Sequence, residues 1–108
     1  MNYKEENGIA IINIDKDINS TNIDDFRKIL DEIKEKDILK IIFDFHNIDF
    51  VLSEVFGLLI ATLKRVRISE GDIIICGVSN KLMRIFQITR LDKVIDIVDN
   101  VNSAKKRL

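Results

Sequence analysis

Residues 41–58 read IIFDFHNIDFVLSEVFGL, and this stretch contains the clearest structural junction of the chain. Its β-branched and aromatic start, Ile41–Phe45, is typical of a buried strand. A short connector follows, and Ser53 stands where an apolar helical pattern begins. A serine there can cap the helix, and it can also accept a phosphoryl group whose charge the helix N-terminus favours. The stretch therefore predicts a strand–turn–helix unit, with Ser53 as the candidate functional residue.

On both sides of this unit, apolar runs typical of strands alternate with segments of helical periodicity. Strands are expected at 8–14, 38–45, 72–78 and 94–98, with a short strand at 1–6 that forms a hairpin through Asn7-Gly8. Helices are expected from residue 21 onward and at 53–68, 80–88 and 100–108. This alternation predicts one α/β domain over residues 1–108, with a mixed, mostly parallel sheet of four to five strands and about four helices.

Helix boundaries are suggested by small polar residues. Thr21 is expected to cap the first helix and Ser79 the third, because their hydroxyls can accept from first-turn N–H groups. Gly71 is suited to the turn after the second helix. The run 94–98 is expected to be the last strand, at an edge of the sheet.

Composition narrows the class of protein. The 108 residues include 17 basic and 18 acidic side chains, which gives no support for binding nucleic acid or a membrane surface. Cys76 is the only cysteine and lies in an apolar run, so we expect a buried thiol in a reducing compartment. No apolar run reaches the roughly 18–20 residues that a membrane-spanning helix needs, and residues 1–6 do not resemble a signal peptide. A cytoplasmic location without membrane insertion is expected.

Catalytic patterns are not found in the sequence. His46 has no second histidine or cysteine beside it to form a metal site, and there is no glycine-rich phosphate loop. Val51 and Val55 occupy the glycine positions of a nucleophile elbow around Ser53. Asp15 and Asp17 could suggest a phosphoacceptor or magnesium site, but a solvated loop is the simpler interpretation. We therefore expect a protein that is not an enzyme and uses no cofactor or metal.

The order of elements and several segments resemble the STAS domain, the module of bacterial anti-sigma factor antagonists. In that family a strand ending in Asp leads to Phe-Ile-Asp-Ser-Ser-Gly-Leu-Gly and an apolar helix. Residues 41–45 resemble the strand, 50–57 the connector, and 81–95 the third helix with the approach to the last strand. The segment 100–104 is similar to the final helix of the family. The resemblance covers nearly the whole chain.

The resemblance implies a protein-interaction switch. In the family, the first serine of the connector is phosphorylated by a partner that is both the anti-sigma factor and a serine kinase of the histidine-kinase-like ATPase type. A serine phosphatase reverses the reaction, and the unphosphorylated antagonist binds the anti-sigma factor and frees the sigma factor. Ser53 stands at the matching position of this chain.

The connector departs from the family pattern around that serine. Leu52 replaces the Asp, Glu54 the second Ser and Val55 the Gly, while an Asp after the first strong strand aligns with Asn19. A phosphate on Ser53 would meet the like charge of Glu54, a repulsion on the order of a few kcal/mol at most near a surface. The residues expected to bind the partner are Asn19, Leu52, Ser53, Glu54, Val55 and Phe56.

Several interpretations stay open from the sequence. Ser53 is either a cap that is also phosphorylated or a cap alone, and Leu52 and Val55 belong either to the core or to an apolar docking surface. The domain could also be an unphosphorylated scaffold or a subunit of a signalling or transport assembly. A small-ligand or nucleotide-binding α/β domain is a further alternative, and a response-regulator receiver a weaker one.

Overall fold

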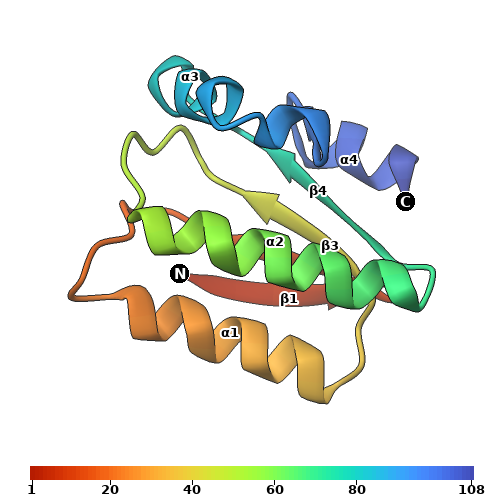
Figure 1. Cartoon of the computed structure of the whole chain (residues 1–108). Helices are drawn as coiled ribbons and strands as arrows, with labels where there is room; N and C mark the ends of the chain where they lie inside the picture. The colour runs from red at the N-terminus through yellow and green to blue at the C-terminus, as the bar shows by residue number, and fades with distance from the viewer.

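The computed structural model describes all residues from Met1 to Leu108, and it shows five strands and four α-helices around one sheet (Figure 1). The elements, in chain order, are β1 (Asn2–Glu6), β2 (Ile9–Asn13), α1 (Ile23–Glu35), β3 (Lys40–Asp44), α2 (Ser53–Ile68), β4 (Asp72–Cys76), α3 (Asn80–Ile88), the 3₁₀ turn η1 (Leu91–Lys93), β5 (Asp96–Val98) and α4 (Val101–Arg107).

The strands form one mixed sheet in the order β1-β2-β3-β4-β5, so neighbours in sequence are neighbours in space. β1 is antiparallel to β2, and every other pair is parallel. The turn between β1 and β2 has positive φ at Asn7 (52°) and Gly8 (80°), as a tight hairpin requires. The predicted fold class and the hairpin are therefore confirmed.

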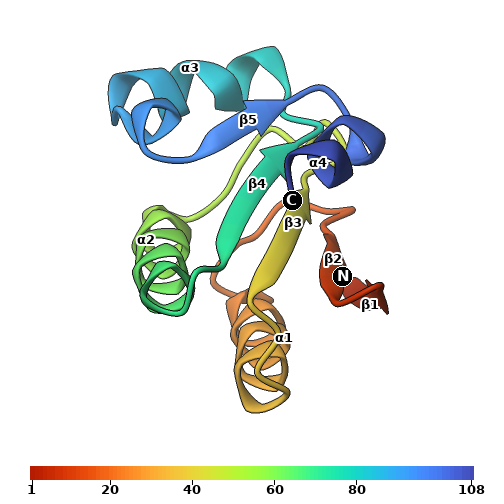
Figure 2. The same cartoon turned by 90° about the vertical axis from the view of Figure 1, so that its right-hand side faces the viewer.

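The two faces of the sheet are covered unequally (Figure 2). Helices α1, α2 and α3 cover one face, and together with the sheet they form a cluster of 25 buried residues. Helix α4 covers the other face alone, where five buried residues meet. The central strands alternate between these clusters, with Ile41 and Phe43 on the larger side and Ile42 on the smaller. This double burial explains why β3 and β4 are almost wholly apolar.

Helix starts follow the predictions in part. Ser79 caps α3, because its side chain accepts a hydrogen bond from the backbone N–H of Leu82. Thr21 does not cap α1: the helix begins at Ile23 with Asn22 as the N-cap residue, and Asn22 makes no side-chain capping bond there. The prediction for Thr21 was wrong because residues Asn19 to Asn22 form a compact turn of their own before the helix.

The end of the chain holds a shorter last strand than expected. Only Asp96–Val98 pairs with β4, at the edge of the sheet as predicted. The preceding residues form η1, which starts after Arg90 in the left-handed conformation (φ 61°). Ile95 is 1% exposed and belongs to the larger core cluster. The apolar run at 94–98 therefore reflects core packing of Ile95 as well as strand pairing.

Gly71 is needed for a reason other than turn geometry. The positive φ after α2 falls on Glu70 (66°). A Cβ atom at Gly71 would lie 2.1 Å from the carbonyl oxygen of Leu39, so only glycine allows the two chain segments to approach this closely. No helix of the chain has both the length and the apolar composition to cross a bilayer.

Candidate functional site

The predicted site lies at the carboxyl ends of the parallel strands, where the β2–α1 and β3–α2 connectors run side by side. Ile18 and Val51 form an isolated parallel bridge between them. The N–H of Ile18 donates to the carbonyl of Phe50 at 3.1 Å, and the N–H of Leu52 donates to the carbonyl of Ile18 at 2.9 Å. This pairing fixes the backbone immediately before Ser53 by contacts that are distant in sequence.

Asp17 is a structural residue of this pair of connectors. Its Oδ1 atom accepts hydrogen bonds from the N–H groups of Asp49 (3.2 Å) and Phe50 (3.3 Å). Asp15 lies 3.0 Å from the amino group of Met1, and this hydrogen bond lowers the pKa of the Asp15 carboxyl. The two carboxylates thus serve separate contacts, and no group of three His, Cys, Asp or Glu side chains is placed to hold a metal ion.

Ser53 is the first helical residue of α2 and not its cap. Leu52 holds the N-cap position with extended backbone angles (φ −58°, ψ 144°), and it cannot offer a side-chain oxygen. The expectation that Ser53 caps the helix was therefore wrong by one position, because the bridge to Ile18 sets where the extended connector ends. Ser53 is exposed at the positive end of a 16-residue helix.

Glu54 lies in the first turn of α2 and forms an ion pair with Arg27 of α1. Arg27 also contacts Asp24 at 2.9 Å, so the guanidinium lies between two carboxylates. All three side chains are substantially exposed, and such pairs contribute little to stability. The pairing nevertheless offsets the negative charge of Glu54 next to Ser53. Arg27 was not predicted as a site residue, since no local pattern links it to Glu54.

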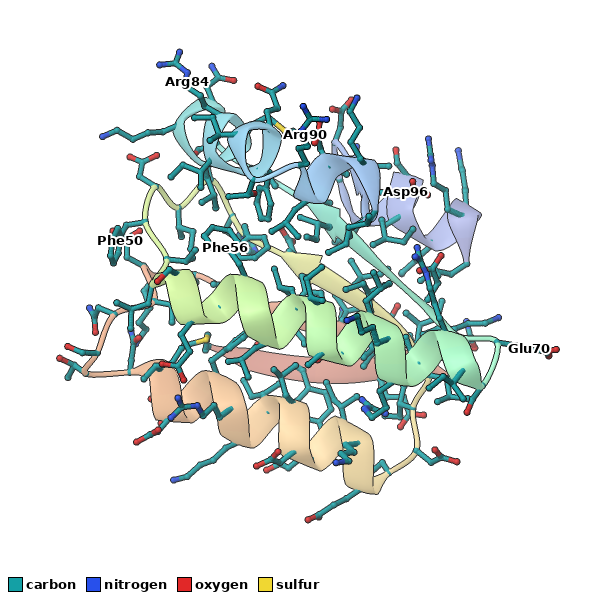
Figure 3. All side chains as sticks on the ribbon, viewed as in Figure 1. Phe50, Phe56, Glu70, Arg84, Arg90 and Asp96 are labelled. Carbon is teal, nitrogen blue, oxygen red and sulfur yellow. The ribbon has the colours of Figure 1, made fainter.

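The apolar residues of the junction divide between surface and core (Figure 3). Phe50 stands on the outer side of the connector with 48% of its surface exposed, and Leu52 is half-buried. Val55 is fully buried in the larger core cluster, so it cannot contact a partner directly. Phe56 is half-buried and packs edge-to-face on Phe86 of α3, with ring centroids 5.5 Å apart. Phe50 was not predicted as a partner-binding residue, although an aromatic side chain in a connector can indicate one.

Asn19 lies on the neighbouring β2–α1 connector, directly after the bridge residue Ile18. Its side-chain oxygen accepts from the N–H groups of Thr21 (2.9 Å) and Asn22 (3.3 Å). The residue is exposed and shapes the turn before α1. The structure thus brings Asn19 to the same end of the molecule as Ser53, while its side-chain oxygen is occupied by local bonds.

Asp44, His46 and Cys76 lie close by, toward the side of the sheet that α4 covers. His46 adopts a positive φ (46°), and its Nε2 atom is 3.1 Å from Oδ2 of Asp44. Burial raises the pKa of the Cys76 thiol to about 12, and the Asp44 carboxylate adds to this effect. A thiol with such a pKa remains protonated and unreactive at neutral pH. The prediction of a buried cysteine is confirmed, and the loop position of His46 also agrees with the structure.

Comparison with known proteins adds to this description. The sequence profile of the STAS domain matches residues 1–104. A Thermotoga maritima protein named as an anti-sigma factor antagonist is 25% identical over 107 residues, which cover 98% of this chain and 95% of that protein. A Thermotoga neapolitana protein named as its homologue is 26% identical over 103 residues, covering 94% of this chain and 91% of that protein.

Solved structures show the same fold. The crystal structure of the Thermotoga maritima protein matches with a TM-score of 0.89 at 25% identity, covering 98% of this chain and 92% of that one. The unphosphorylated anti-sigma factor antagonist SpoIIAA matches with a TM-score of 0.84 over 98% of this chain and 93% of its own, at 16% identity.

Proposed function

This chain belongs to the STAS domain family, and from that premise we propose that it is an anti-sigma factor antagonist controlled at Ser53. Its docking surface is the β3–α2 junction together with Asn19 of the neighbouring connector. The partner is an anti-sigma factor that is also a serine kinase of the histidine-kinase-like ATPase type. Binding of the unphosphorylated protein occupies the anti-sigma factor and releases the sigma factor.

The observation that carries this proposal is the position of Ser53. The residue is exposed, it begins a long helix, and the N-cap position beside it is held by Leu52. A serine that is not needed as a cap can be modified without loss of a structural hydrogen bond. The first N–H groups of a helix have no intrahelical acceptor, so they and the helix dipole favour a phosphate at this end.

The ion pair between Arg27 and Glu54 supports modification despite the acidic neighbour. A free Glu54 carboxylate would oppose a phosphate that carries about −1.5 to −2 charge. Because Arg27 offsets that carboxylate, the repulsion between Glu54 and a phosphoserine is smaller than the sequence suggests. Arg27 is also a cation at this end of the molecule with which a phosphate can interact.

The surface around Ser53 has the composition of a small protein interface. Phe50 and the half-buried Leu52 supply apolar area, and aromatic residues including Phe are enriched in protein interfaces. Asn19 and Glu54 form its polar rim. Val55 and Phe56 act beneath the surface, where they fix the helix start against the core. A phosphate on Ser53 would place a large charge beside the apolar area and oppose docking.

Phosphoryl transfer provides the direct test. The purified chain is incubated with its anti-sigma factor kinase and ATP, and its intact mass is measured. We expect the mass of one added phosphoryl group on the wild type and none on Ser53→Ala, with Ser69→Ala as the control that is still modified. An unmodified wild type, together with anti-sigma factor binding that is indifferent to Ser53→Asp, would contradict the proposal.

A second candidate function is a STAS scaffold that is never phosphorylated. Its support is Glu54 in the first turn of α2, where a negative charge already occupies part of the field that a phosphate would use. This candidate predicts stable stoichiometric binding to a partner that is not a kinase. Unchanged binding by Ser53→Ala and Ser53→Asp would favour it over the switch.

A further inference from the structure

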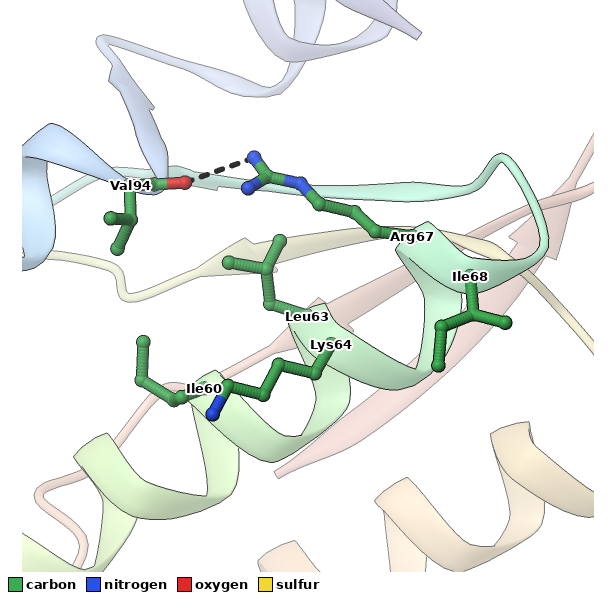
Figure 4. A pocket seen from close by; sticks show the side chains of 6 residues that line it. All are labelled: Ile60, Leu63, Lys64, Arg67, Ile68 and Val94. Carbon is green, nitrogen blue, oxygen red and sulfur yellow. Dashed lines mark hydrogen bonds between the residues drawn. The ribbon is translucent and has the colours of Figure 1, made fainter.

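A groove lies at the opposite end of α2 from Ser53, between the second half of that helix and the turn leading into β5 (Figure 4). Its volume is about 600 Å³, and the residues that line it are Ile60, Leu63, Lys64, Arg67, Ile68 and Val94. None of these residues belongs to the junction, and the nearest of them, Ile60, lies about 10 Å along α2 from Ser53 at a rise of 1.5 Å per residue. The groove is therefore distinct from the junction described above.

The rim of the groove exposes apolar side chains that have no partner in the chain. Ile68 is 86% exposed and Val94 is 44% exposed, and both count among the few large hydrophobic residues on the surface. Both residues line the same groove, and apolar surface left in water is unfavourable by roughly 25 cal/mol per Å². A partner that covers Ile68 and Val94 would recover this free energy.

The arrangement of the lining residues fits a helix. Five of the six come from α2 and form two rows at four-residue spacing: Ile60, Lys64 and Ile68 in one row, Leu63 and Arg67 in the other. Such rows are the ridges between which the side chains of a neighbouring helix pack. The groove is open at the surface, so it suits a helix laid along it better than a small molecule that must be enclosed.

The charge of the lining defines the partner further. Lys64 and Arg67 are the charged residues that line the groove, and no acidic residue does. Arg67 is fixed by a hydrogen bond of 2.9 Å to the carbonyl of Val94 and by a contact of 3.3 Å with Asp72, so it joins the two walls. Lys64 forms no ion pair within the chain. Because the Asp72 carboxylate already offsets the charge of Arg67, Lys64 is the unpaired cation of the groove.

From these features we infer that the groove binds an amphipathic helix of a second protein, with an apolar ridge flanked by carboxylates, of which one meets Lys64. A second copy of this chain fits less well. A symmetric contact would place Lys64 and Arg67 against their own copies, and the exposed isoleucines of α3 lie beside Lys81 and Arg84. The domain would hold one partner at this groove while Ser53 controls another, so the inference extends the proposed function.

A designed peptide tests the inference without the anti-sigma factor, so its outcome is independent of the switch at Ser53. The probe is a helical peptide of about five turns with a leucine ridge flanked by Glu, and its counterpart carries Lys at the same positions. Each is titrated into the ¹⁵N-labelled chain. We expect the acidic peptide to shift the amide signals of Ile60, Lys64, Ile68 and Val94, and the basic peptide to leave them unchanged.

Variants sharpen this test. Ile68→Glu should weaken binding of the acidic peptide about tenfold or more, because it removes an exposed isoleucine that the peptide would cover and adds a like charge. Ile88→Glu is the matched control, since Ile88 is 74% exposed but lies outside the groove. Lys64→Glu, which leaves Arg67 and its contacts in place, should prefer the basic peptide. All three variants change exposed side chains, and thermal unfolding verifies that they fold.

Four results would overturn the inference. The acidic peptide could cause no shifts, both peptides could bind equally, or Ile68→Glu and Ile88→Glu could lose binding equally. The fourth result concerns the oligomeric state, which light scattering after gel filtration measures and which we expect to be a monomer. A dimer that Ile68→Glu dissociates would assign the groove to a second copy of the chain.

Discussion

Helices α2 and α3 follow neighbouring strands of one sheet, and each has a serine at its start, but the two serines differ in their contacts. Ser79 is half-buried, accepts from the N–H of Leu82 at 3.1 Å and donates to the carbonyl of Ile48 at 2.9 Å. Ser53 is exposed, and the N-cap position beside it belongs to Leu52. The hydroxyl of Ser79 makes two hydrogen bonds within the fold, whereas Ser53 is exposed to solvent. The contrast shows that position near a helix start does not by itself define the role of a serine.

Helices α2 and α3 pack into the same core cluster. Truncation of an aromatic side chain in this cluster should have the largest effect on stability. Phe86 is fully buried and packs against two other aromatic rings, with centroid distances of 6.1 Å to Phe45 and 5.5 Å to Phe56. Phe86→Ala should lower the free energy of unfolding by about 3–5 kcal/mol, because it removes an aromatic side chain and leaves a cavity. Urea unfolding measures this loss. Ile88→Ala, at an exposed position of the same helix, should change little, and similar losses in both variants would contradict the account.

Loss of the structural serine should have the next largest effect. Ser79→Ala removes the cap of α3 and leaves the Ile48 carbonyl without its hydroxyl donor, so we expect a loss of about 1–2 kcal/mol. Chemical unfolding of the variant beside Ser69→Ala, at an exposed position, provides the comparison. An unchanged unfolding midpoint would show that Ser79 is not the residue that holds the start of α3.

The ion pair beside Ser53 should contribute less. A double-mutant cycle with Arg27→Ala and Glu54→Ala should give a coupling free energy of about 0.2–1 kcal/mol, as for other exposed pairs. The coupling should decrease in high salt, because the side chains are screened by solvent ions. A coupling that is absent at low salt would mean that Arg27 does not offset the charge of Glu54.

The smallest effect on stability is expected at Ser53 itself. Ser53→Ala should change the free energy of unfolding by less than about 0.5 kcal/mol, because it removes only the hydroxyl of an exposed residue that does not cap the helix. Measured beside Ser79→Ala under the same conditions, the difference between the two variants quantifies the contrast. A loss at Ser53 as large as that at Ser79 would assign it a structural role.

The sequence was sufficient for the parts of the fold that depend on local patterns. The apolar runs of β3 and β4 and the periodic helices α1 and α2 were predicted correctly, because strand and helix periods leave distinct patterns. The cap at Ser79 was also predicted, since a serine before a helical pattern is a local signal. The mixed, mostly parallel sheet followed from the alternation of strands and helices.

The parts that were missed depend on contacts between segments distant in sequence. The bridge between Ile18 and Val51 sets the end of the β3–α2 connector and thereby places Leu52, not Ser53, at the N-cap. The pairing of Arg27 with Glu54 joins two helices whose relation no local pattern reveals. The burial of Val55, which separates it from the residues proposed to dock, also becomes clear only in the folded chain.

Binding to the anti-sigma factor after addition of charge at Ser53 tests the central claim most directly. Calorimetric titration compares the wild type with Ser53→Asp and with Ser69→Asp, which adds the same charge at the other end of α2. The account predicts that Ser53→Asp weakens binding about tenfold or more, whereas Ser69→Asp and Ser53→Ala bind like the wild type. Equal affinity of Ser53→Asp and the wild type would contradict a docking surface controlled at Ser53.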